Sequence, residues 1–419
     1  MKERVLKLVA RLLGGAARKM AAKLPPTTLV VGVTGSSGKT STKEAIGELV
    51  KITFGDNALV SSGNLNNEIG LPLALLGYSE VPSAWQYPII VLGSYIRAWR
   101  RKPLGAYVLE YAVDRPGDMD GLISIIRPNV AVITNIASVH LENYSSLEEL
   151  VSEKLKIALN LPGSGVVVYN GDDDNLTRHI NKLNLSCRQI TFGSGKDNDI
   201  RLLRYKLESN KTEFSISVDG KERDYSINAL GEQHIMATLP AVVVAKLMEL
   251  SHETVAKALE NYVPLPGRGN IIFGVKDSVI INDTYNANPL STEKMLNVLN
   301  NMPAPKKVAV LGDMLELGDH SKYEHERILT IAKKSANLVV TVGRRMAESK
   351  IAHHSFLSPM EAAQFLKDHL DKGTVLAVKG SQSMRMEYIV KELMLDQQKA
   401  DELLPRQNDT WRSKPFELV

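Results

Sequence analysis

A glycine-rich segment near the N-terminus has the residue types and spacing of a phosphate-binding loop. It reads Thr34-Gly-Ser-Ser-Gly-Lys-Thr-Ser-Thr-Lys43. Lys39 could reach the β- and γ-phosphates of a nucleotide, and the Thr40 hydroxyl could coordinate Mg²⁺. An apolar, β-branched run, Leu29–Val33, precedes the loop and a helical pattern, Lys43–Val50, follows it, so backbone N–H groups at a helix N-terminus would surround the anion. The segment predicts a nucleoside-triphosphate site.

The glycines of this loop would let the backbone approach the anion closely. The general pattern has a glycine where this chain has Val33, and the alternative interpretation is a glycine-rich turn without a ligand. We predict that the whole loop binds nucleotide, namely Gly35, Ser36, Ser37, Gly38, Lys39, Thr40 and Ser41.

Further polar residues follow the predicted strands downstream of the loop. Glu110 and Asn135 each come after an apolar strand pattern, His140 lies five residues beyond Asn135, and Lys154 lies one helix later. Ligands of open α/β sheets bind at the carboxyl ends of the strands. Oxygen ligands together with substrate phosphates suit Mg²⁺. Each residue alone is typical of a structural role, but Glu110, His140 and Thr40 together predict a magnesium site.

The composition is that of an ordinary folded protein and sets few limits on function. The chain has 419 residues, of which 44% are hydrophobic and 23% charged. That length predicts two or three domains. A single cysteine, Cys187, excludes an internal disulfide and a multi-cysteine metal site, and it fits a reducing, cytoplasmic setting. No apolar run reaches the roughly 20 residues that span a bilayer.

The positive charge is concentrated at the N-terminus. Residues 1–28 contain seven Lys or Arg and one Glu, which leaves 44 basic and 46 acidic residues in the rest of the chain. The body is therefore nearly neutral, and we expect no nucleic-acid partner. The leader has a helical apolar stripe interrupted at Gly14-Gly15. A surface-lying amphipathic helix, a mitochondrial-type leader and a helix packed on the body all remain open.

The chain alternates strand and helix patterns, which predicts an α/β fold: a P-loop central domain with a mostly parallel sheet, followed by a Rossmann-like α/β domain. Ser146 and Glu149 predict a capped helix at Leu147–Leu159, and Asp219-Gly220 predicts a hairpin turn. A proline-rich segment, 264–267, predicts a domain junction. The predicted parts are a basic leader (1–28), a central domain (29–264) with an insertion (81–105), a C-terminal domain (265–395) and a tail (396–419).

The insertion at 81–105 has an apolar stripe of helical spacing. Apolar residues recur every three or four positions, and three basic residues follow them: Trp85, Ile89, Leu92, Ile96, Trp99, then Arg100, Arg101 and Lys102. The spacing places the apolar residues on one side of a helix too short to cross a membrane. Aromatic and basic flanks suit a membrane interface. Packing against the body or against a second copy is the alternative.

Seven segments of the chain together resemble the Mur ligase family, from about residue 29 to 395. They are TGSSGKTSTK (34–43), SGNLNNEIGLPLALL (62–76), VLEYAVDRPGDMDGL (108–122), RPNVAVITNIASVHLENYSSLEELVSEK (127–154), PGRGN (266–270), NDTYNANPLS (282–291) and LGDMLELGDHS (311–321). The sixth and seventh resemble the branch that adds D-alanyl-D-alanine. The Asp-Asn-Pro-Arg signature of the diamino-acid-adding branch is absent.

The resemblance implies an ATP-dependent, ADP-forming amide ligase that works through an acyl phosphate. Glu110 and His140 match metal ligands, Asn135 matches a polar residue near the acyl phosphate, and Lys154 matches a lysine that becomes carbamylated and binds Mg²⁺. We accordingly expect Lys39, Asn135, His140 and Lys154 to be catalytic. In the C-terminal part, Arg268 and Asp283 match ATP contacts, and Asn286, Asn288 and Pro289 match the loop near the incoming peptide.

The chain departs from the family pattern at four places. Only about 28 residues precede the first strand, so we expect the domain that grips a UDP-sugar to be missing. The nucleotide motif Gly-x-His-Asn-x-x-Asn reads Gly231-Glu-Gln-His-Ile-Met-Ala-Thr238, without either asparagine. Lys156 replaces the usual Glu, and the insertion at 81–105 is additional.

These features predict a ligase that joins D-alanyl-D-alanine or a similar amine donor to an acceptor carboxylate in cell-wall precursor synthesis. Its cofactors would be ATP and Mg²⁺, and its location the cytoplasm, or the inner membrane face with a membrane or protein partner held through 1–28 and 81–105. A ligase like folylpolyglutamate synthase and a nucleotide-binding scaffold with impaired catalysis are the alternatives.

Overall fold

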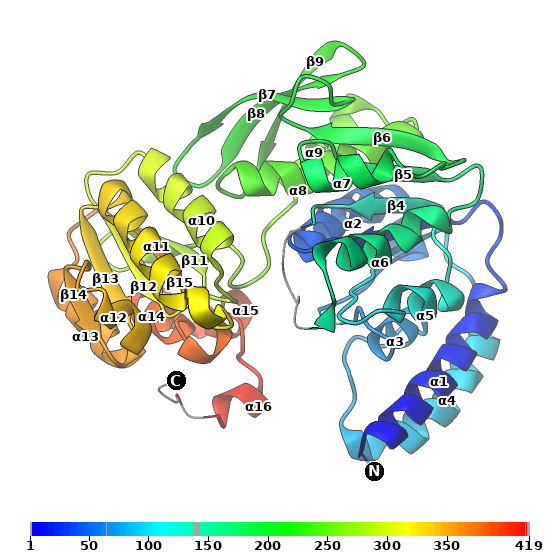
Figure 1. Ribbon diagram of the computed structural model, residues 1–419, viewed down its shortest axis with the longest axis horizontal. Coiled ribbons are helices and arrows are strands. Elements are labelled where there is room, and N and C mark those ends of the chain that lie inside the picture. Colours follow the sequence, from blue (N-terminus) through cyan, green and yellow to red (C-terminus); the bar gives the residue numbers. More distant parts are fainter. Residues whose placement is uncertain (1, 64, 137–142, 415, 417–419) are drawn as a thin grey trace. The chain divides into compact units, whose positions relative to one another are not determined.

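The computed structural model describes residues 2–63, 65–136, 143–414 and 416. The chain divides into two compact units. The N-terminal unit comprises Met1–Arg204, Phe214–Tyr225 and Ile235–Tyr262, and the C-terminal unit comprises Tyr205–Glu213, Ser226–His234 and Val263–Val419. Each is an α/β structure built on its own sheet, which confirms the predicted fold class (Figure 1).

The first sheet has nine strands in the part of the chain that is described, in the order β2-β3-β1-β4-β5-β6-β7-β8-β9. The strands are β1 (Leu29–Thr34), β2 (Ala58–Val60), β3 (Ala106–Glu110), β4 (Val130–Ile133), β5 (Val166–Asn170), β6 (Arg188–Gly193), β7 (Ile200–Leu207), β8 (Thr212–Val218) and β9 (Lys221–Ile227). Every recorded pairing from β2 to β7 is parallel. The predicted hairpin turn joins β8 to β9, with left-handed backbone at Asp219 and Gly220.

Helices cover both faces of this sheet, as the right-handed connections of parallel strands require. They are α1 (Lys2–Ala21), α2 (Lys39–Phe54), α3 (Gly70–Leu75), α4 (Tyr87–Arg100), α5 (Asp118–Ile125), α6 (Leu147–Leu159), α7 (Asp174–Ile180), α8 (Glu232–Leu247) and α9 (His252–Glu260). Helix α6 begins and ends as predicted, and the Ser146 hydroxyl accepts a hydrogen bond from Glu149 N at 3.2 Å.

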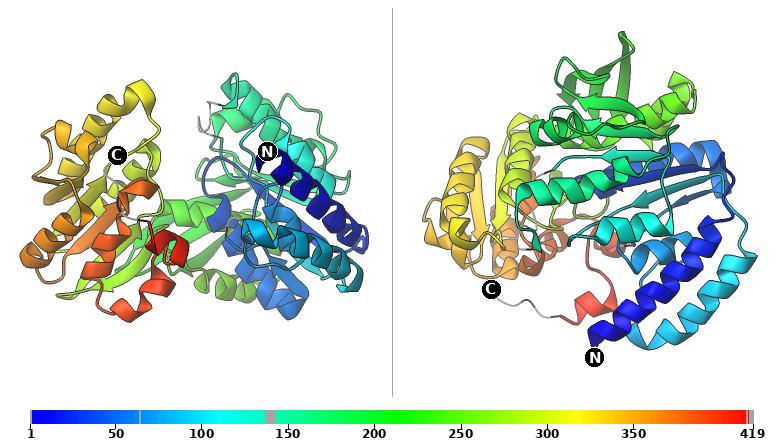
Figure 2. Two further views of the ribbon diagram at one scale, coloured as in Figure 1. Left: turned by 90° about the horizontal axis from the view of Figure 1, so that it is seen from below. Right: turned by 45° about the vertical axis from the view of Figure 1, so that its right-hand side comes forward.

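The basic leader forms one continuous helix, α1, although Gly14-Gly15 interrupt its apolar stripe. These glycines serve close packing. A Cβ at Gly15 would lie 2.9 Å from the Tyr95 hydroxyl of α4, so the absence of a side chain lets the two helices approach. The α1 face with Leu13, Ala17 and Met20 is fully buried. Helices α1 and α4 therefore lie side by side (Figures 1 and 2).

The insertion forms a helix as predicted. The alternative in which its apolar stripe packs against the body is wrong. Its five side chains are 49–76% exposed. Helix α4 contacts α1 through its other face, where Tyr87, Ser94 and Ala98 are buried. Within the described ranges, no helix combines the length and the apolar character needed to cross a bilayer.

The C-terminal unit has a second sheet in the order β10-β11-β15-β12-β13-β14, in which only β10 and β11 pair antiparallel. Its strands are β10 (Asn270–Gly274), β11 (Ser278–Asp283), β12 (Lys307–Gly312), β13 (Leu338–Val342), β14 (His354–Phe356) and β15 (Val375–Lys379). Its helices are α10 (Pro289–Asn301), α11 (Ser321–Ser335), α12 (Arg344–Glu348), α13 (Pro359–His369), α14 (Glu387–Leu393), α15 (Ala400–Leu403) and α16 (Asp409–Arg412).

Candidate active site

The predicted phosphate-binding loop lies at the point where the strand order of the first sheet reverses. Strand β1 lies between β3 on one side and β4 on the other. Crevices at such a switch point, outside the carboxyl ends of the strands, are where open α/β sheets bind ligands. The loop follows β1, Glu110 is the last residue of β3, and Thr134 and Asn135 follow β4. The fold therefore brings three of the sequence motifs to one edge.

The loop conformation requires glycine at position 35. Its φ is +143°, a region that side-chain-bearing residues rarely adopt. A Cβ there would lie 2.0 Å from the Thr134 hydroxyl oxygen. Gly35 thus allows the loop to pass directly over the end of β4.

Thr134 and Asn135, which follow β4, hold the phosphate-binding loop in place through hydrogen bonds. The Thr134 hydroxyl donates to Ser37 O at 2.6 Å. The Asn135 side chain accepts from Ser37 N at 2.8 Å and donates to the Ser37 hydroxyl at 2.7 Å. The backbone of Asn135 also accepts from Ser36 N at 2.8 Å. Asn135 therefore fixes the loop in this structure, which is a positioning role in addition to the catalytic one predicted.

Two lysines from different elements meet at one carbonyl oxygen of the loop. Lys39 Nζ, at the start of α2, donates to Gly35 O at 2.9 Å. Lys154 Nζ, from α6, donates to the same oxygen at 3.2 Å. Lys154 is 2% exposed. The structure therefore brings Lys154 to the phosphate-binding loop, although 119 residues separate it from Gly35 in the sequence.

The environment of Lys154 favours its neutral form. Burial, and after it the charge of Lys39, lower the pKa of its amine to about 7, against the opposing charges of Asp114 and Glu153. The pKa of Lys156, two residues further along α6, shifts in the opposite direction. Lys156 pairs with Asp120 at 2.6 Å and with Glu153 at 2.7 Å, and its hydrogen bonds to these carboxylates raise its pKa.

The two carboxylate oxygens of Glu110 have different surroundings. Its Oε1 accepts from the Asn66 side chain at 3.0 Å. Its Oε2 is buried and has no hydrogen-bond partner in the described part of the chain. Because a buried, unpaired carboxylate oxygen is costly, a bound cation fits this position.

The rest of the predicted magnesium site is partly outside the structure. His140 lies outside the described residues. Among the residues that are described, no three side chains of the His, Cys, Asp and Glu types gather closely enough to hold a metal ion. Thr40 is buried at the start of α2. The residues that fit a cation here are Thr40 and Glu110, with Lys154 only after conversion to an anion.

The other predicted contacts lie in the C-terminal unit. The Arg268 guanidinium stacks on the Tyr285 ring at 4.2 Å. Asp283, at the end of β11, pairs with Lys379 at 2.6 Å, and Lys379 also donates to Asn286 O at 2.9 Å. Lys379 is 3% exposed. Asp283 and Asn286 are therefore held together by one buried lysine.

Asn288 and Pro289 form the N-terminus of α10. The Asn288 side chain accepts from Ser291 N at 2.8 Å, and the Ser291 hydroxyl accepts from Asn288 N at 3.2 Å. Pro289 is in the first turn, where its missing N–H costs nothing. The cap accounts for Asn288 structurally, and its predicted contact with a peptide stays a prediction.

Sequence reasoning missed two basic residues that support this loop. Lys379 ends strand β15, so its position at a carboxyl end was an available signal. Arg406, in the predicted tail, donates to Thr284 O at 2.5 Å and Tyr285 O at 2.9 Å and pairs with buried Glu387 at 2.6 Å. No local sequence pattern indicated a supporting role for Arg406. The segment around it belongs to the C-terminal unit.

The altered nucleotide motif has Ile235 and Thr238 where the family pattern has asparagines. Ile235 and Thr238 are fully buried, and the Thr238 hydroxyl donates to Ile235 O at 2.7 Å within α8. His234 is 4% exposed, and burial lowers its pKa to about 4 against the opposing charge of Asp283. These positions are part of the protein interior.

Two family models match the chain. The Mur ligase middle domain matches residues 33–245, and the Mur ligase glutamate ligase domain matches residues 267–382. The chain therefore belongs to the Mur ligase family, as its motifs predicted.

Its relatives include enzymes of one branch of that family. The chain is 30% identical over 380 residues to the UDP-N-acetylmuramoyl-tripeptide–D-alanyl-D-alanine ligase of Bacillus subtilis, covering 88% of this chain and 76% of the relative. It is 28% identical to the Escherichia coli enzyme of the same name, covering 87% and 76%. Its fold is similar to that of the MurF ligase of Thermotoga maritima solved in complex with ADP, with a TM-score of 0.76, 26% identity and coverage of 91% and 83%.

Proposed function

We propose that this chain is an ATP-dependent, ADP-forming amide ligase that joins D-alanyl-D-alanine, or a similar amine donor, to an acceptor carboxylate in cell-wall precursor synthesis. The observation that carries the proposal is the convergence of Lys39 and Lys154 on Gly35 O at the switch point of the sheet. The relatives named above support the choice of donor.

The proposed reaction has two steps. The acceptor carboxylate attacks the γ-phosphorus of ATP, which releases ADP and leaves an acyl phosphate. The donor amine then attacks the acyl carbon, loses a proton to solvent and displaces phosphate. Lys39 and the loop N–H groups would stabilise the negative charge that develops during phosphoryl transfer. Mg²⁺, if bound at Thr40 and Glu110, would neutralise part of that charge.

Lys154 is suited to carbamylation, the role that the family pattern implies. The neutral amine attacks CO₂ and releases a proton, which converts the cation into a carboxylate-like anion. A pKa of about 7 leaves a large share of the amine neutral at physiological pH. The anion would complete the oxygen ligands around Mg²⁺, with His140 as the further predicted ligand.

In the C-terminal unit, Arg268 and Asp283 are the proposed ATP contacts, and Asn286, Asn288 and Pro289 the proposed donor loop. Lys379 and Arg406 would act as positioning residues, because they hold the backbone and side chains of this loop.

An isotope experiment tests the proposal. The chain is incubated with ATP, Mg²⁺, D-alanyl-D-alanine and a cell-wall precursor extract in which carboxylates carry ¹⁸O. Mass spectrometry should show a product heavier by the dipeptide minus water, with ¹⁸O transferred to the released phosphate. ATP hydrolysis without ligation would favour the scaffold alternative. Ligation of glutamate to a folate would favour the folylpolyglutamate synthase-like one.

The proposed location is the cytoplasm. The sequence also suggested attachment at the inner membrane face, or to a protein partner, through residues 1–28 and 81–105. The two options need different surface chemistry, and the exposed side chains of α1 and α4 support the membrane option.

A further inference from the structure

Helix α4 and the turn before it expose an apolar stripe of five large side chains. Their exposed fractions are 75% for Trp85, 71% for Ile89, 68% for Leu92, 49% for Ile96 and 76% for Trp99. Large exposed apolar patches on a folded protein mark a protein or membrane interaction surface. On the neighbouring α1, Val5 and Leu8 are more than half exposed as well.

The stripe is held on a rigid support. Lys23, just after α1, donates to Ala98 O and Trp99 O at the end of α4, both at 2.7 Å. The Lys19 amine lies 5.2 Å from the centre of the Tyr95 ring. These contacts, with the close approach at Gly15, fix α4 against α1 and leave its outer face open (Figure 2).

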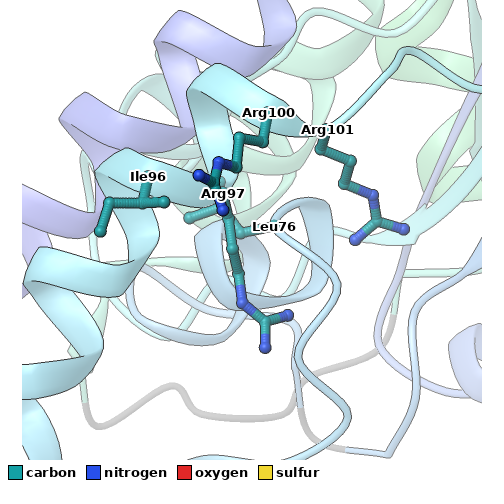
Figure 3. Close-up of a pocket in the computed structure, with 5 residues that line it drawn as sticks. All are labelled: Leu76, Ile96, Arg97, Arg100 and Arg101. Carbon is teal, nitrogen blue, oxygen red and sulfur yellow. The ribbon is translucent and has the colours of Figure 1, made fainter.

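The charged residues of the segments that form and support the stripe are nearly all basic. Residues 1–28 contain seven Lys or Arg and one Glu, and residues 81–105 contain four Lys or Arg and no Asp or Glu. An open hollow of about 410 Å³ lies at the end of α4. Two apolar side chains and three arginines line it: Leu76, Ile96, Arg97, Arg100 and Arg101 (Figure 3).

Two of these arginines are fixed by the protein. Arg97 stacks on the Tyr78 ring at 4.1 Å and donates to Gly77 O at 3.3 Å. Arg101 packs against Gly77, where a Cβ would collide with its guanidinium. The hollow is therefore a preformed cationic site with an apolar side, which matches a lipid phosphate above its acyl chain.

We propose that the surface formed by α1, α4 and this hollow docks on an anionic membrane. Helix α4 has 14 residues, about 21 Å at 1.5 Å per residue, so it would lie in the plane of the interface. Trp99 of α4 and Trp85 of the turn before it would sit at the level of the headgroups, where such side chains are enriched. The basic residues supply attraction to anionic lipid.

A second copy of the chain is a poorer occupant. A two-fold interface would place the same basic residues of both copies against one another, and like charges repel. The charge pattern instead favours an acidic partner, and three aliphatic side chains with a tryptophan at each end fit a lipid interface.

Vesicle sedimentation with the whole chain tests the proposal. Vesicles of phosphatidylglycerol and phosphatidylcholine in equal parts should bind it at least about ten-fold better than phosphatidylcholine alone, and about 500 mM NaCl should weaken binding several-fold. The double variant Trp85→Ala/Trp99→Ala should lose at least about ten-fold, and Arg100→Glu/Lys102→Glu should lose only the preference for anionic vesicles. Tyr323→Ala, at a 65% exposed aromatic of α11, is the control.

Fluorescence quenching gives an independent readout. The chain has three tryptophans, so Trp411→Phe leaves Trp85 and Trp99 as reporters. Brominated acyl chains should quench them. Absence of sedimentation and quenching at low salt would overturn the proposal. It would also be overturned if the chain bound no vesicles and instead formed a dimer that Trp99→Ala converts to monomer. The double tryptophan variant should keep ligation of water-soluble substrates, so this test and that of the ligase function fail separately.

Discussion

The two loops that carry the predicted site residues differ in how their charged groups are satisfied. In the N-terminal unit, Lys39 and Lys154 share one carbonyl oxygen, and one oxygen of Glu110 has no described partner. In the C-terminal unit, Asp283 has a close ion pair with Lys379. A buried polar atom without a partner, such as this Glu110 oxygen, is available to a ligand, whereas a paired network fixes geometry. We therefore expect chemistry from the first loop and positioning from the second.

The largest effect should come from Lys154. Lys154→Ala removes the group that would become the anionic metal ligand, so turnover should fall by about 1,000-fold or more. Lys154→Arg should be equally inactive, because a guanidinium stays cationic. Short-chain carboxylates such as acetate should restore part of the Lys154→Ala activity, measured as ADP release coupled to ligation. Full activity of Lys154→Ala would show that the groups at the first loop do not supply the chemistry, and the proposed difference between the two loops would be wrong.

The second largest effect should come from Lys379. Lys379→Met keeps the volume and removes the cation that joins Asp283 to Asn286 O. We expect ligation to fall about 10- to 100-fold, mainly through a higher KM for ATP or donor, and the free energy of unfolding to fall by about 2 kcal/mol. Lys372→Met, which removes an 82% exposed lysine from a surface ion pair with Asp277, is the matched control and should change neither by a comparable amount. An unaltered KM in Lys379→Met would show that the second loop does not position a substrate.

Acid should weaken the C-terminal unit through His234. Burial lowers its folded pKa to about 4, below the ordinary 6.5, so the unfolded chain binds the proton first as the pH falls. Its contribution is present above pH 6.5 and is lost progressively toward pH 4. Between pH 7.5 and pH 5.0, protonation of His234 should lower the free energy of unfolding by about 2 kcal/mol, which urea unfolding at the two pH values measures. His234→Gln should lose this part of the pH dependence, whereas His320→Gln, on the surface, should keep it.

Local motifs predicted the first loop well and the second only in part. The glycine, lysine and threonine spacing of residues 34–43 and the Ser146 cap fix local structure directly, and the meeting of Lys154 with Gly35 O agrees with that register. The support from Arg406 joins residues 121 positions apart and could not be read from any pattern. For α4, the periodicity predicted the stripe, but which face packs on α1 depends on the tertiary structure.

The smallest effect should come from Lys156, which sharpens the contrast within one helix. Lys156→Ala removes a partly exposed amine that pairs with Asp120 and Glu153, while Glu153 keeps the hydrogen bond from Met119 N at 2.8 Å. Such a pair contributes about 1 kcal/mol or less, so the free energy of unfolding should fall by that amount and turnover should stay within about two-fold. Urea unfolding and the ligation assay measure both. Lys154 and Lys156 share a helix but have pKa shifts of opposite sign, because one is buried beside a cation and the other lies between carboxylates. If Lys156→Ala lost ligation and Lys154→Ala kept it, the register of the carbamylated lysine would be two residues further along α6.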